Sequence, residues 1–312
     1  MLVCLLREIC RDEGYEFNAF SGDWIIRIHD SGSVSFVFGY DFGLNNATSR
    51  MIGADKAATA ELLAAAAIPA VEHRLFLTPQ LATYIGDDGN WESIHDFFIQ
   101  HGRDVVCKPN DGTGGRDVSR VRTIQQLEAA VHRLFARNRS ICLSPFVLIT
   151  AEYRVYMMGG TAQVVYAKER PSVVGDGCST TLELALRNGL YRTDRGVEIS
   201  RDGFDATRVP GEGEEVLLNW RHNLGQGGSA RLLGEHHGLF PVLSSLAASA
   251  TSTLGIELAA VDIVQIGDRF MVLEVNCGIM MESFARSSVE NRDLAKQFYR
   301  DILKEALNRK AR

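Results

Sequence analysis

The sequence predicts a fold that mixes helices and strands, in the α/β or α+β class. Strand-like apolar runs alternate with helical stretches over most of the 312 residues. Hydrophobic residues make up 46% of the chain, which is enough to bury a sizeable core. Because the chain is too long for one ordinary core, we expect two or three subdomains.

The first elements are predicted from apolar spacing and from residues that end helices. Apolar residues at helical spacing predict a helix over Leu2–Glu13. Two strands are expected at 24–28 and 34–38, joined by turn residues. A helix rich in Ala and Leu is expected after Asp55, because Asp is a good N-cap, and it ends before Pro69.

The remaining elements follow the same reasoning. Thr123 and Gln126 form a capping box at the start of a helix. A pair of apolar runs around Gly267 and Asp268 predicts a β-hairpin near the C-terminus. The expected strands are 104–108, 140–147, 153–158, 162–168, 259–266 and 270–275, and the further expected helices are 182–186, 244–254 and 288–308.

Charge and cysteine usage restrict the class of protein. The net charge is -6 and the pI is near 5.8, so no nucleic-acid partner is expected, because such a partner would require a basic patch. The six cysteines are scattered without a CxxC pair, which disfavours a zinc site and indicates a reducing compartment. The first residues are too briefly apolar for a signal peptide or a membrane span, so we expect a soluble cytoplasmic protein without a membrane partner.

The first chemical motif is a strand that ends in Lys108 and Pro109, followed by a glycine-rich loop. The loop residues are Asn110, Asp111, Gly112, Thr113, Gly114 and Gly115. Glycines let backbone N–H groups approach phosphate oxygens, and lysine adds a positive charge. The lysine precedes the glycines, so this is not a Walker A loop. The alternative is an ordinary surface loop.

The second motif places two arginines on neighbouring strand candidates. Arg154 and Arg170 could converge on one anion, because a guanidinium matches phosphate oxygens well. The alternative is that each forms a surface salt bridge. A third stretch, NLGQGGSARL, carries Asn223, Gly227 and Gly228 and suggests another loop lined by backbone groups.

The fourth motif is the end of the C-terminal hairpin, LEVN. Side chains alternate along a strand, so Glu274 and Asn276 should share one face. Asp262 on the partner strand would complete a set of oxygen ligands that suits Mg²⁺. A two-residue turn would place Asp262 opposite Leu273, on the wrong face. We therefore predict an odd-length loop or a β-bulge that brings Asp262 opposite Glu274.

The order of these motifs resembles the ATP-grasp superfamily. The residues that carry the resemblance are the DK pair at a helix start, KP before the glycine loop, EYRV, RPSVVGDGCST, the N-x-x-x-GG loop and LEVN. The match runs from about Ser49 to about Gly278. It is strongest to amino-acid ligases, namely the ATP-grasp part of cyanophycin synthetase and the glutathione-synthetase-like part of bifunctional glutathione enzymes.

The resemblance implies an ATP-dependent carboxylate–amine ligase that forms an amide or peptide bond through an acyl phosphate. Residues 1–69 would be an N-terminal region, 70–150 the small lid subdomain and 151–312 the core subdomain with a Mg²⁺-binding hairpin. ATP and Mg²⁺ would be the cofactors, and amino acids or small peptides the substrates. The resemblance leaves a homodimer open.

The resemblance also implies a role for each motif. The implied nucleotide-binding residues are Lys56, Lys108, Asn110, Gly112, Thr113, Gly114, Gly115, Pro145, Phe146 and Val147. Arg154 and Arg170 would be catalytic, and Asp262, Glu274 and Asn276 would bind the metal ion. Asn223, Gly227, Gly228, Cys277 and Gly278 would line the substrate side.

Two departures from the family pattern concern recognition of the substrates. No carboxylate lies between Cys142 and Thr150, so adenine or ribose would be bound by the backbone of 145–148 or by Glu152. Cys277 follows the metal hairpin, where we expect a small packed residue; the alternative is a reactive thiol. Two other functions remain open: an ATP-grasp kinase, and a nucleotide-binding regulator without turnover.

Overall fold

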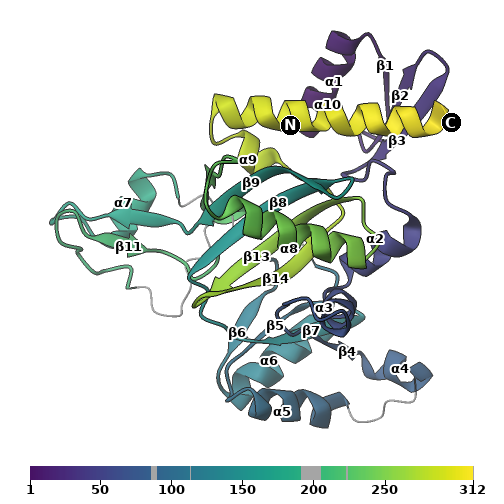
Figure 1. The fold of residues 1–312 in the computed structure, drawn as a ribbon. Coiled ribbons are helices and arrows are strands. Elements are labelled where there is room, and N and C mark those ends of the chain that lie inside the picture. Colours follow the sequence, from purple (N-terminus) through teal and green to yellow (C-terminus); the bar gives the residue numbers. More distant parts are fainter. Residues whose placement is uncertain (86–89, 113, 191–204, 223, 312) are drawn as a thin grey trace.

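Antiparallel sheets organise the chain in the computed structural model (Figure 1). The structure describes residues 1–85, 90–112, 114–190, 205–222 and 224–311. Within these residues the strand orders are β1-β2-β3, β4-β7-β5-β6, β12-β9-β8-β13-β14 and β10-β11. The strands are β1 (Glu16–Phe20), β2 (Ile25–Asp30), β3 (Ser33–Phe38), β4 (Arg74–Leu77), β5 (Val105–Pro109), β6 (Ser119–Val121), β7 (Ser140–Pro145), β8 (Ala151–Met158), β9 (Thr161–Glu169), β10 (Ser172–Val174), β11 (Glu215–Leu217), β12 (Ser229–Leu232), β13 (Leu258–Ile266) and β14 (Arg269–Asn276).

Several of the predicted helices are bounded by the residues expected at their ends. Asp55 accepts a hydrogen bond from the Ala58 N–H, and the capping box of Thr123 and Gln126 forms as expected. Gly14 ends the first helix at φ 77°, a conformation that favours glycine. The helices are α1 (Leu2–Glu13), α2 (Ala47–Ala54), α3 (Lys56–Ala65), α4 (Pro79–Ala82), η1 (Thr83–Ile85), α5 (Asn90–Gln100), α6 (Ile124–Phe135), α7 (Thr181–Arg187), η2 (Leu224–Gln226), α8 (Phe240–Thr253), α9 (Glu282–Ala285) and α10 (Val289–Ala311).

Some elements differ from the sequence predictions. The elements that were not predicted are β1, β4, β6, β10, β11, β12, α2, α4, α5, α9 and the two short 3-10 helices. Among them, β1 alternates exposed and half-buried residues, and Asn46 caps α2 through the Ser49 N–H. Helix α8 begins at Phe240 rather than at 244, because Pro241 is compatible with the first turn of a helix. Predictions of a mixed α+β fold and of the C-terminal hairpin are confirmed.

Helix α8 covers one face of the five-stranded sheet. The opposite face carries charged side chains. Along β8, Tyr153, Val155 and Met157 pack in the core that includes α8 residues. The alternate residues of β8, Glu152 and Arg154, point to the opposite face. That face lies toward the four-stranded sheet β4-β7-β5-β6, which forms the lower part of Figure 1.

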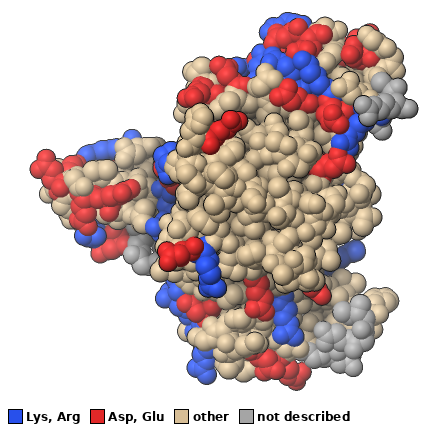
Figure 2. All heavy atoms as spheres, viewed as in Figure 1, with Lys and Arg blue, Asp and Glu red and all other residues tan. Residues whose placement is uncertain are grey.

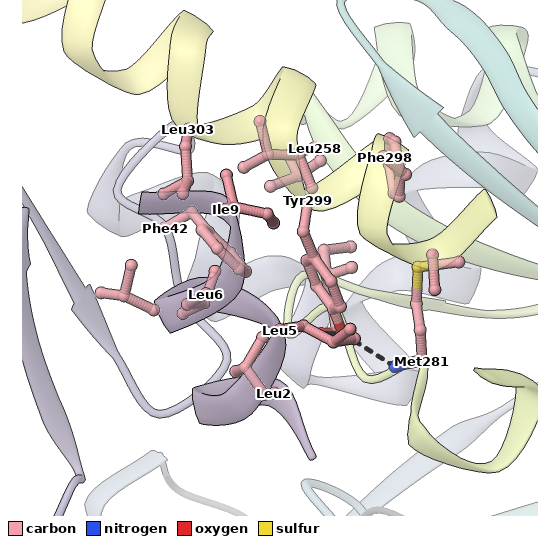
Figure 3. Close-up of a cluster of buried hydrophobic side chains, with 14 of the residues drawn as sticks. Leu2, Leu5, Leu6, Ile9, Phe42, Leu258, Met281, Phe298, Tyr299 and Leu303 are labelled. Carbon is pink, nitrogen blue, oxygen red and sulfur yellow. Dashed lines mark hydrogen bonds between the residues drawn. The ribbon is translucent and has the colours of Figure 1, made fainter. Parts of the chain in front are cut away.

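The N-terminal helix and the C-terminal helix close a second core against the other end of this sheet. In Figure 3, Leu2, Leu5, Leu6 and Ile9 of α1 lie beside Phe42 and the α10 side chains Tyr299 and Leu303. The Tyr299 hydroxyl accepts a hydrogen bond from the Met281 N–H at 3.1 Å (Figure 3). It also donates to the Ile279 carbonyl at 3.1 Å. The segment after β14 is therefore held in place by α10.

Backbone hydrogen bonds tie the four-stranded sheet to the five-stranded sheet. The Val71 N–H donates to the Val272 carbonyl at 2.8 Å, and the Val272 N–H donates to the Pro69 carbonyl at 2.9 Å. On the second connection, the Thr150 N–H donates to the Gln265 carbonyl at 2.9 Å. Both chain crossings between the sheets are thus anchored on the β13–β14 hairpin.

The surface charge is uneven on the face drawn in Figure 2. Lys, Arg, Asp and Glu gather over α1 and α10, over the lobe that carries α7 and over the four-stranded sheet, while the centre is nearly free of charge. Helix α8, which lies over that centre in Figure 1, has no charged residue. In the described part of the chain, no helix has the length and apolar character needed to span a membrane.

Candidate functional site

A cavity of about 380 Å³ lies between the four-stranded and five-stranded sheets. Both sheets contribute to its wall: Lys108 and Pro145 come from the first, and Arg154 and Glu274 from the second. The predicted site residues that line this cavity are Lys56, Lys108, Gly112, Gly114, Gly115, Pro145, Phe146, Val147, Arg154, Glu274, Asn276 and Gly278. A cavity of this size with a mixed apolar and charged wall is typical of a small-molecule site.

A buried network of charged side chains lies under the cavity. Arg154 donates from Nε to Asp262 Oδ1 at 2.7 Å and from Nη2 to Oδ2 at 2.6 Å. Lys168 Nζ lies 2.9 Å from Asp262 Oδ1 and donates to Glu152 Oε1 at 2.6 Å. These residues stand on β8, β9 and β13, and two cations balance two carboxylates.

The network shifts the pKa values of its members. Burial alone would raise the pKa of Asp262, but Arg154 and Lys168 outweigh it and hold that pKa well below its usual range. Burial and Arg154 lower the pKa of Lys168, yet Asp262 and Glu152 raise it more, so the net direction is upward. Glu152 differs, because burial raises its pKa more than Lys168 lowers it. Removing one member would leave an unpaired buried charge, at a cost of about 3–5 kcal/mol.

The hairpin of β13 and β14 has a bulge next to Asp262, one of the two arrangements that the sequence predicted. Ile266 pairs with Arg269 across a two-residue turn, and the register shifts next to Asp262, so that Asp262 pairs with Glu274 while Ile263 pairs with Val272. The unpaired Leu273 forms the bulge. The prediction that Asp262 lies opposite Glu274 is therefore confirmed.

Glu274 and Asn276 line the cavity, whereas Asp262 does not. Asn276 Nδ2 donates to Glu274 Oε1 at 3.3 Å, which leaves the Asn276 carbonyl oxygen available as a ligand. Asp262 is 1% exposed and its carboxylate is already paired with two cations. Among the described residues, no group of three or more His, Cys, Asp or Glu could hold a metal ion. A Mg²⁺ that is bound largely by nucleotide phosphates needs only one or two protein carboxylates, and Glu274 with Asn276 fits that requirement.

Lys108 is positioned by a histidine that the sequence did not indicate. Lys108 Nζ lies 2.6 Å from His73 Nε2, and His73 Nδ1 lies 2.8 Å from the Val71 carbonyl. Because Nδ1 donates to that carbonyl, Nε2 is the acceptor for the lysine. Burial, then the charge of Lys108, lower the pKa of His73 well below its ordinary value. Burial also lowers the pKa of Lys108, although nearby Glu274 raises it.

The glycine-rich loop is attached to the start of α3. Lys56 Nζ donates to the carbonyls of Asn110, at 3.3 Å, and of Gly112. Asn110 is buried, and its side-chain oxygen accepts a hydrogen bond from the Ala57 N–H at 3.2 Å. Asn110 therefore supports the loop from behind, and Lys56 faces the cavity.

Aromatic side chains lie at the other end of the cavity, close to the stretch between Cys142 and Thr150 that has no carboxylate. Phe146 meets Trp220 with ring centroids 5.6 Å apart, and the guanidinium of Arg120 lies 3.4 Å from the centre of the Phe146 ring. Glu152 lines the cavity, but its carboxylate is bound to Lys168. The backbone and rings around Phe146 are thus the better candidates for contacting a nucleotide base.

Several predicted residues lie outside the cavity wall. Among the described residues these are Asn110, Arg170, Gly227, Gly228, Asp262 and Cys277. Thr113 and Asn223 lie outside the described residues. Burial, followed by the charges of Arg170 and Lys168, lowers the pKa of His222 to about 4, so Arg170 lies near a residue of the cavity wall. Its predicted role in catalysis stays a prediction, as does that of Arg154.

Sequence reasoning missed Tyr166, Trp220, Arg221 and Ser283 of the cavity wall. It also missed His73, which contacts Lys108 but does not line the cavity. Trp220 and Arg221 come shortly before the NLGQGG stretch, so a wider reading of that motif could have found them. Nothing in the sequence connects His73 with Lys108, because the contact depends on the pairing of β4 and β5 with β7.

Comparisons with known proteins agree with this architecture. No protein-family model matches the chain. Among curated proteins, the glutathione biosynthesis bifunctional protein GshAB of Mannheimia succiniciproducens is 24% identical over 194 residues, 55% of this chain and 25% of that protein. The GshAB of Streptococcus mutans is 24% identical over 196 residues, 57% of this chain and 26% of that protein. The chain thus spans about a quarter of the length of these relatives.

Solved structures show the same fold. A bifunctional glutathione synthetase from Pasteurella multocida has a TM-score of 0.56 at 17% identity, covering 96% of this chain and 44% of that one. A D-alanine–D-alanine ligase from Bacillus anthracis has a TM-score of 0.56 at 14% identity, covering 85% and 70%. The chain has the α+β ATP-grasp fold, and the resemblance predicted from the sequence is confirmed.

Proposed function

We propose that this protein is an ATP-dependent carboxylate–amine ligase that acts on amino acids or small peptides. The observation that carries the proposal is the cavity between the two sheets, with Lys56 and Lys108 lining it together with the oxygen atoms of Glu274 and Asn276. Cations suit the phosphates of ATP, and hard oxygen ligands suit Mg²⁺. The names of the similar proteins, which are glutathione-forming and D-alanine-joining enzymes, support the same class.

The proposed reaction has two steps. A substrate carboxylate oxygen attacks the γ-phosphorus of ATP, the bond to the bridging oxygen breaks, and ADP leaves with that electron pair. An amine nitrogen then attacks the acyl carbon of the acyl phosphate, the carbon–oxygen bond to phosphate breaks, and the nitrogen's proton passes to the phosphate that leaves. The products are an amide, ADP and inorganic phosphate.

Residues of the chain would bind and orient the reactants. Lys108, held by His73, would contact the phosphates, and Lys56 would fix the glycine-rich loop over them. Glu274 and Asn276 would hold Mg²⁺, which supplies positive charge against the phosphate oxygens. Arg154 lines the cavity while it is bound to Asp262, so it would stabilise negative charge from a fixed position. Phe146 and its neighbours would contact adenine.

An activity screen tests the proposal. Each amine of a panel is mixed with each carboxylic acid of a second panel, ATP and Mg²⁺, and the release of ADP and phosphate is measured. The expected result is release of ADP and phosphate that depends on both a carboxylate and an amine, with a product mass equal to their sum minus water. Release of ADP with a phosphorylated product and no free phosphate would show a kinase instead. Nucleotide binding without any turnover across the panel would show a regulator.

A further inference from the structure

A second cavity, of about 510 Å³, lies beside the first. The two cavities have wall residues in common, so the second one opens next to the proposed phosphate site. The shared residues are Lys56, Gly112, Glu274, Asn276 and Gly278. The other residues that line the second cavity come largely from the N-terminal region, between Trp24 and Thr59. Of that region, only Lys56 also lines the first cavity.

The outer wall of this cavity is aromatic. Trp24 and Phe38 meet edge to face with ring centroids 6.0 Å apart, and Tyr40 follows on the same loop. Trp24 is 53% exposed and Phe38 is 58% exposed. Phe38 of β3 lies opposite Ile25 of β2, and it is on the exposed face of the β1-β2-β3 sheet. Exposed aromatic rings that border a cavity are a common mark of a binding site, because covering them removes apolar surface from water.

One guanidinium stands in the same wall. Arg50 of α2 lies with Nε 3.3 Å from Asp41 Oδ2. Asp41 Oδ1 accepts a hydrogen bond from the Gly43 N–H at 2.9 Å, so both carboxylate oxygens have partners within the chain. Asp41 is therefore suited to orient Arg50 rather than to bind an ammonium group. The contact through Nε leaves the paired Nη groups of Arg50 in a geometry that suits a carboxylate.

We propose that the second cavity binds the amine-supplying substrate, and that this substrate is an α-amino acid with an apolar or aromatic side chain. The proposal rests on the ligase function proposed above. Arg50 would hold the α-carboxylate, and Trp24 with Phe38 would cover the side chain. The amine would point to the wall that both cavities share, where the acyl phosphate forms.

The position of Arg50 decides which substrate the cavity takes. A carboxylate that is to be phosphorylated must reach the first cavity, and Arg50 lines only the second. A carboxylate on Arg50 therefore stays unreacted, as the α-carboxylate of an amine donor must. Cys277 also lines this cavity, but it is 7% exposed and packs against Gly53, where a Cβ would lie 2.7 Å from its sulfur.

Calorimetric titration of the full chain, with Mg²⁺ and a non-hydrolysable ATP analogue present, tests the site. The probes are L-phenylalanine, L-phenylalaninamide and L-alanine. L-phenylalanine should bind at least about tenfold more tightly than either of the others, because the amide lacks the carboxylate and alanine lacks the ring. Arg50→Met should weaken L-phenylalanine about tenfold and leave the amide unchanged. Binding of L-phenylalanine that is no tighter than that of its amide would overturn the proposal.

A matched pair of aromatic variants separates the cavity from general surface effects. Phe38→Ala should weaken L-phenylalanine several-fold, roughly as expected for an aromatic contact. Phe36→Ala should not, because Phe36 is 55% exposed on the same side of β3 but does not line the cavity. Equal losses in the two variants would contradict the assignment.

The same variants distinguish this inference from the ligase proposal. If phosphate release with an amine acceptor persists but does not respond to Arg50→Met or Phe38→Ala, the second cavity is not the acceptor site and the ligase function stands. If L-phenylalanine binds as expected but no carboxylate and amine together release phosphate, the cavity binds an amino acid and the ligase function fails, and with it the role as acceptor site.

Discussion

Glu274 is the residue whose charge the proposed metal site needs most. Glu274→Gln keeps the shape of the side chain and its hydrogen bond with Asn276 but removes the negative charge. We expect kcat to fall by roughly 100-fold or more, as for other losses of a charged group at a reacting phosphate, with little change in thermal stability. Steady-state phosphate release and a melting curve measure both. Glu61→Gln, an exposed change on α3, is the control. A Glu274→Gln enzyme with the kcat of the original would refute the metal-site role.

His73 offers a test of how Lys108 is positioned. Gln at position 73 can present an acceptor to the lysine, whereas Leu cannot. We expect His73→Leu to raise the KM for ATP about tenfold, because a buried ammonium group loses a hydrogen-bond partner. His73→Gln should restore most of the affinity. Equal effects of Leu and Gln would show that His73 matters only for packing.

The same histidine predicts a pH dependence of stability. Its pKa in the folded protein lies well below 6.5, so below pH 6.5 the unfolded chain binds the proton and the folded chain does not. The free energy of unfolding should therefore decrease as pH falls from 6.5, by at most about 1.4 kcal/mol per pH unit for this one site. Urea denaturation at pH 7.5 and 5.5 measures the loss, which His73→Gln should reduce. A larger loss in the Gln variant would contradict this assignment.

At the scale of single elements, Tyr299 of α10 fixes the segment that follows the β13–β14 hairpin. Its hydroxyl bonds to backbone groups of Ile279 and Met281, and Met280 and Gly278 line the cavity. Tyr299→Phe leaves those buried backbone groups without a partner, so we expect a loss of about 1–3 kcal/mol in the free energy of unfolding. Urea denaturation gives the value.

The control for Tyr299→Phe is Tyr84→Phe, because Tyr84 is 86% exposed. The segment after β14 is part of the cavity wall, so a loosened segment should also lower turnover. A Tyr299→Phe protein with unchanged stability would show that the two hydrogen bonds make no net contribution.

The elements also show how far sequence reasoning reaches. Strand alternation was sufficient to predict that Glu274 and Asn276 share a face. It also predicted that the hairpin needs one residue more than a two-residue turn provides if Asp262 is to lie opposite Glu274. Strand alternation could not decide whether the extra residue lies in a longer loop or in a bulge, because either one places Asp262 opposite Glu274. The structure has the bulge at Leu273. Strand alternation also could not reveal that Arg154 binds Asp262, since that contact depends on the register of β8 against β13.

At the scale of the whole molecule, the two sides of the cavity have separate hydrophobic cores. One core contains only residues between Phe76 and Leu143, on the four-stranded sheet and its helices. A second core joins α1, α10 and the five-stranded sheet, and a third joins α8 and that sheet. A small fourth core lies under α7 and the β10-β11 sheet. The cores are separate, so the two sides are linked by other contacts. These include the two backbone crossings, the bonds of Lys56 with Asn110 and Gly112, and the hydrogen bond from Arg221 Nη2 to the Val118 carbonyl.

This division predicts that nucleotide changes the stability of the two parts unequally. Without nucleotide, amide hydrogens of β5 and β7 should exchange through openings of lower free energy than those of β8 and β13, because the smaller core can open alone. Under the proposed function, a non-hydrolysable ATP analogue with Mg²⁺ would contact both sheets, so it should stabilise the four-stranded sheet by about 2.7 kcal/mol at a concentration of 100 Kd. Native-state hydrogen exchange with and without the analogue measures the difference.

Lys108→Met should lose most of this protection while the exchange of β8 and β13 stays the same. If β5 and β7 exchange as slowly as β8 and β13 without nucleotide, or do not respond to it, then the two sheets form one cooperative unit and ATP does not join them.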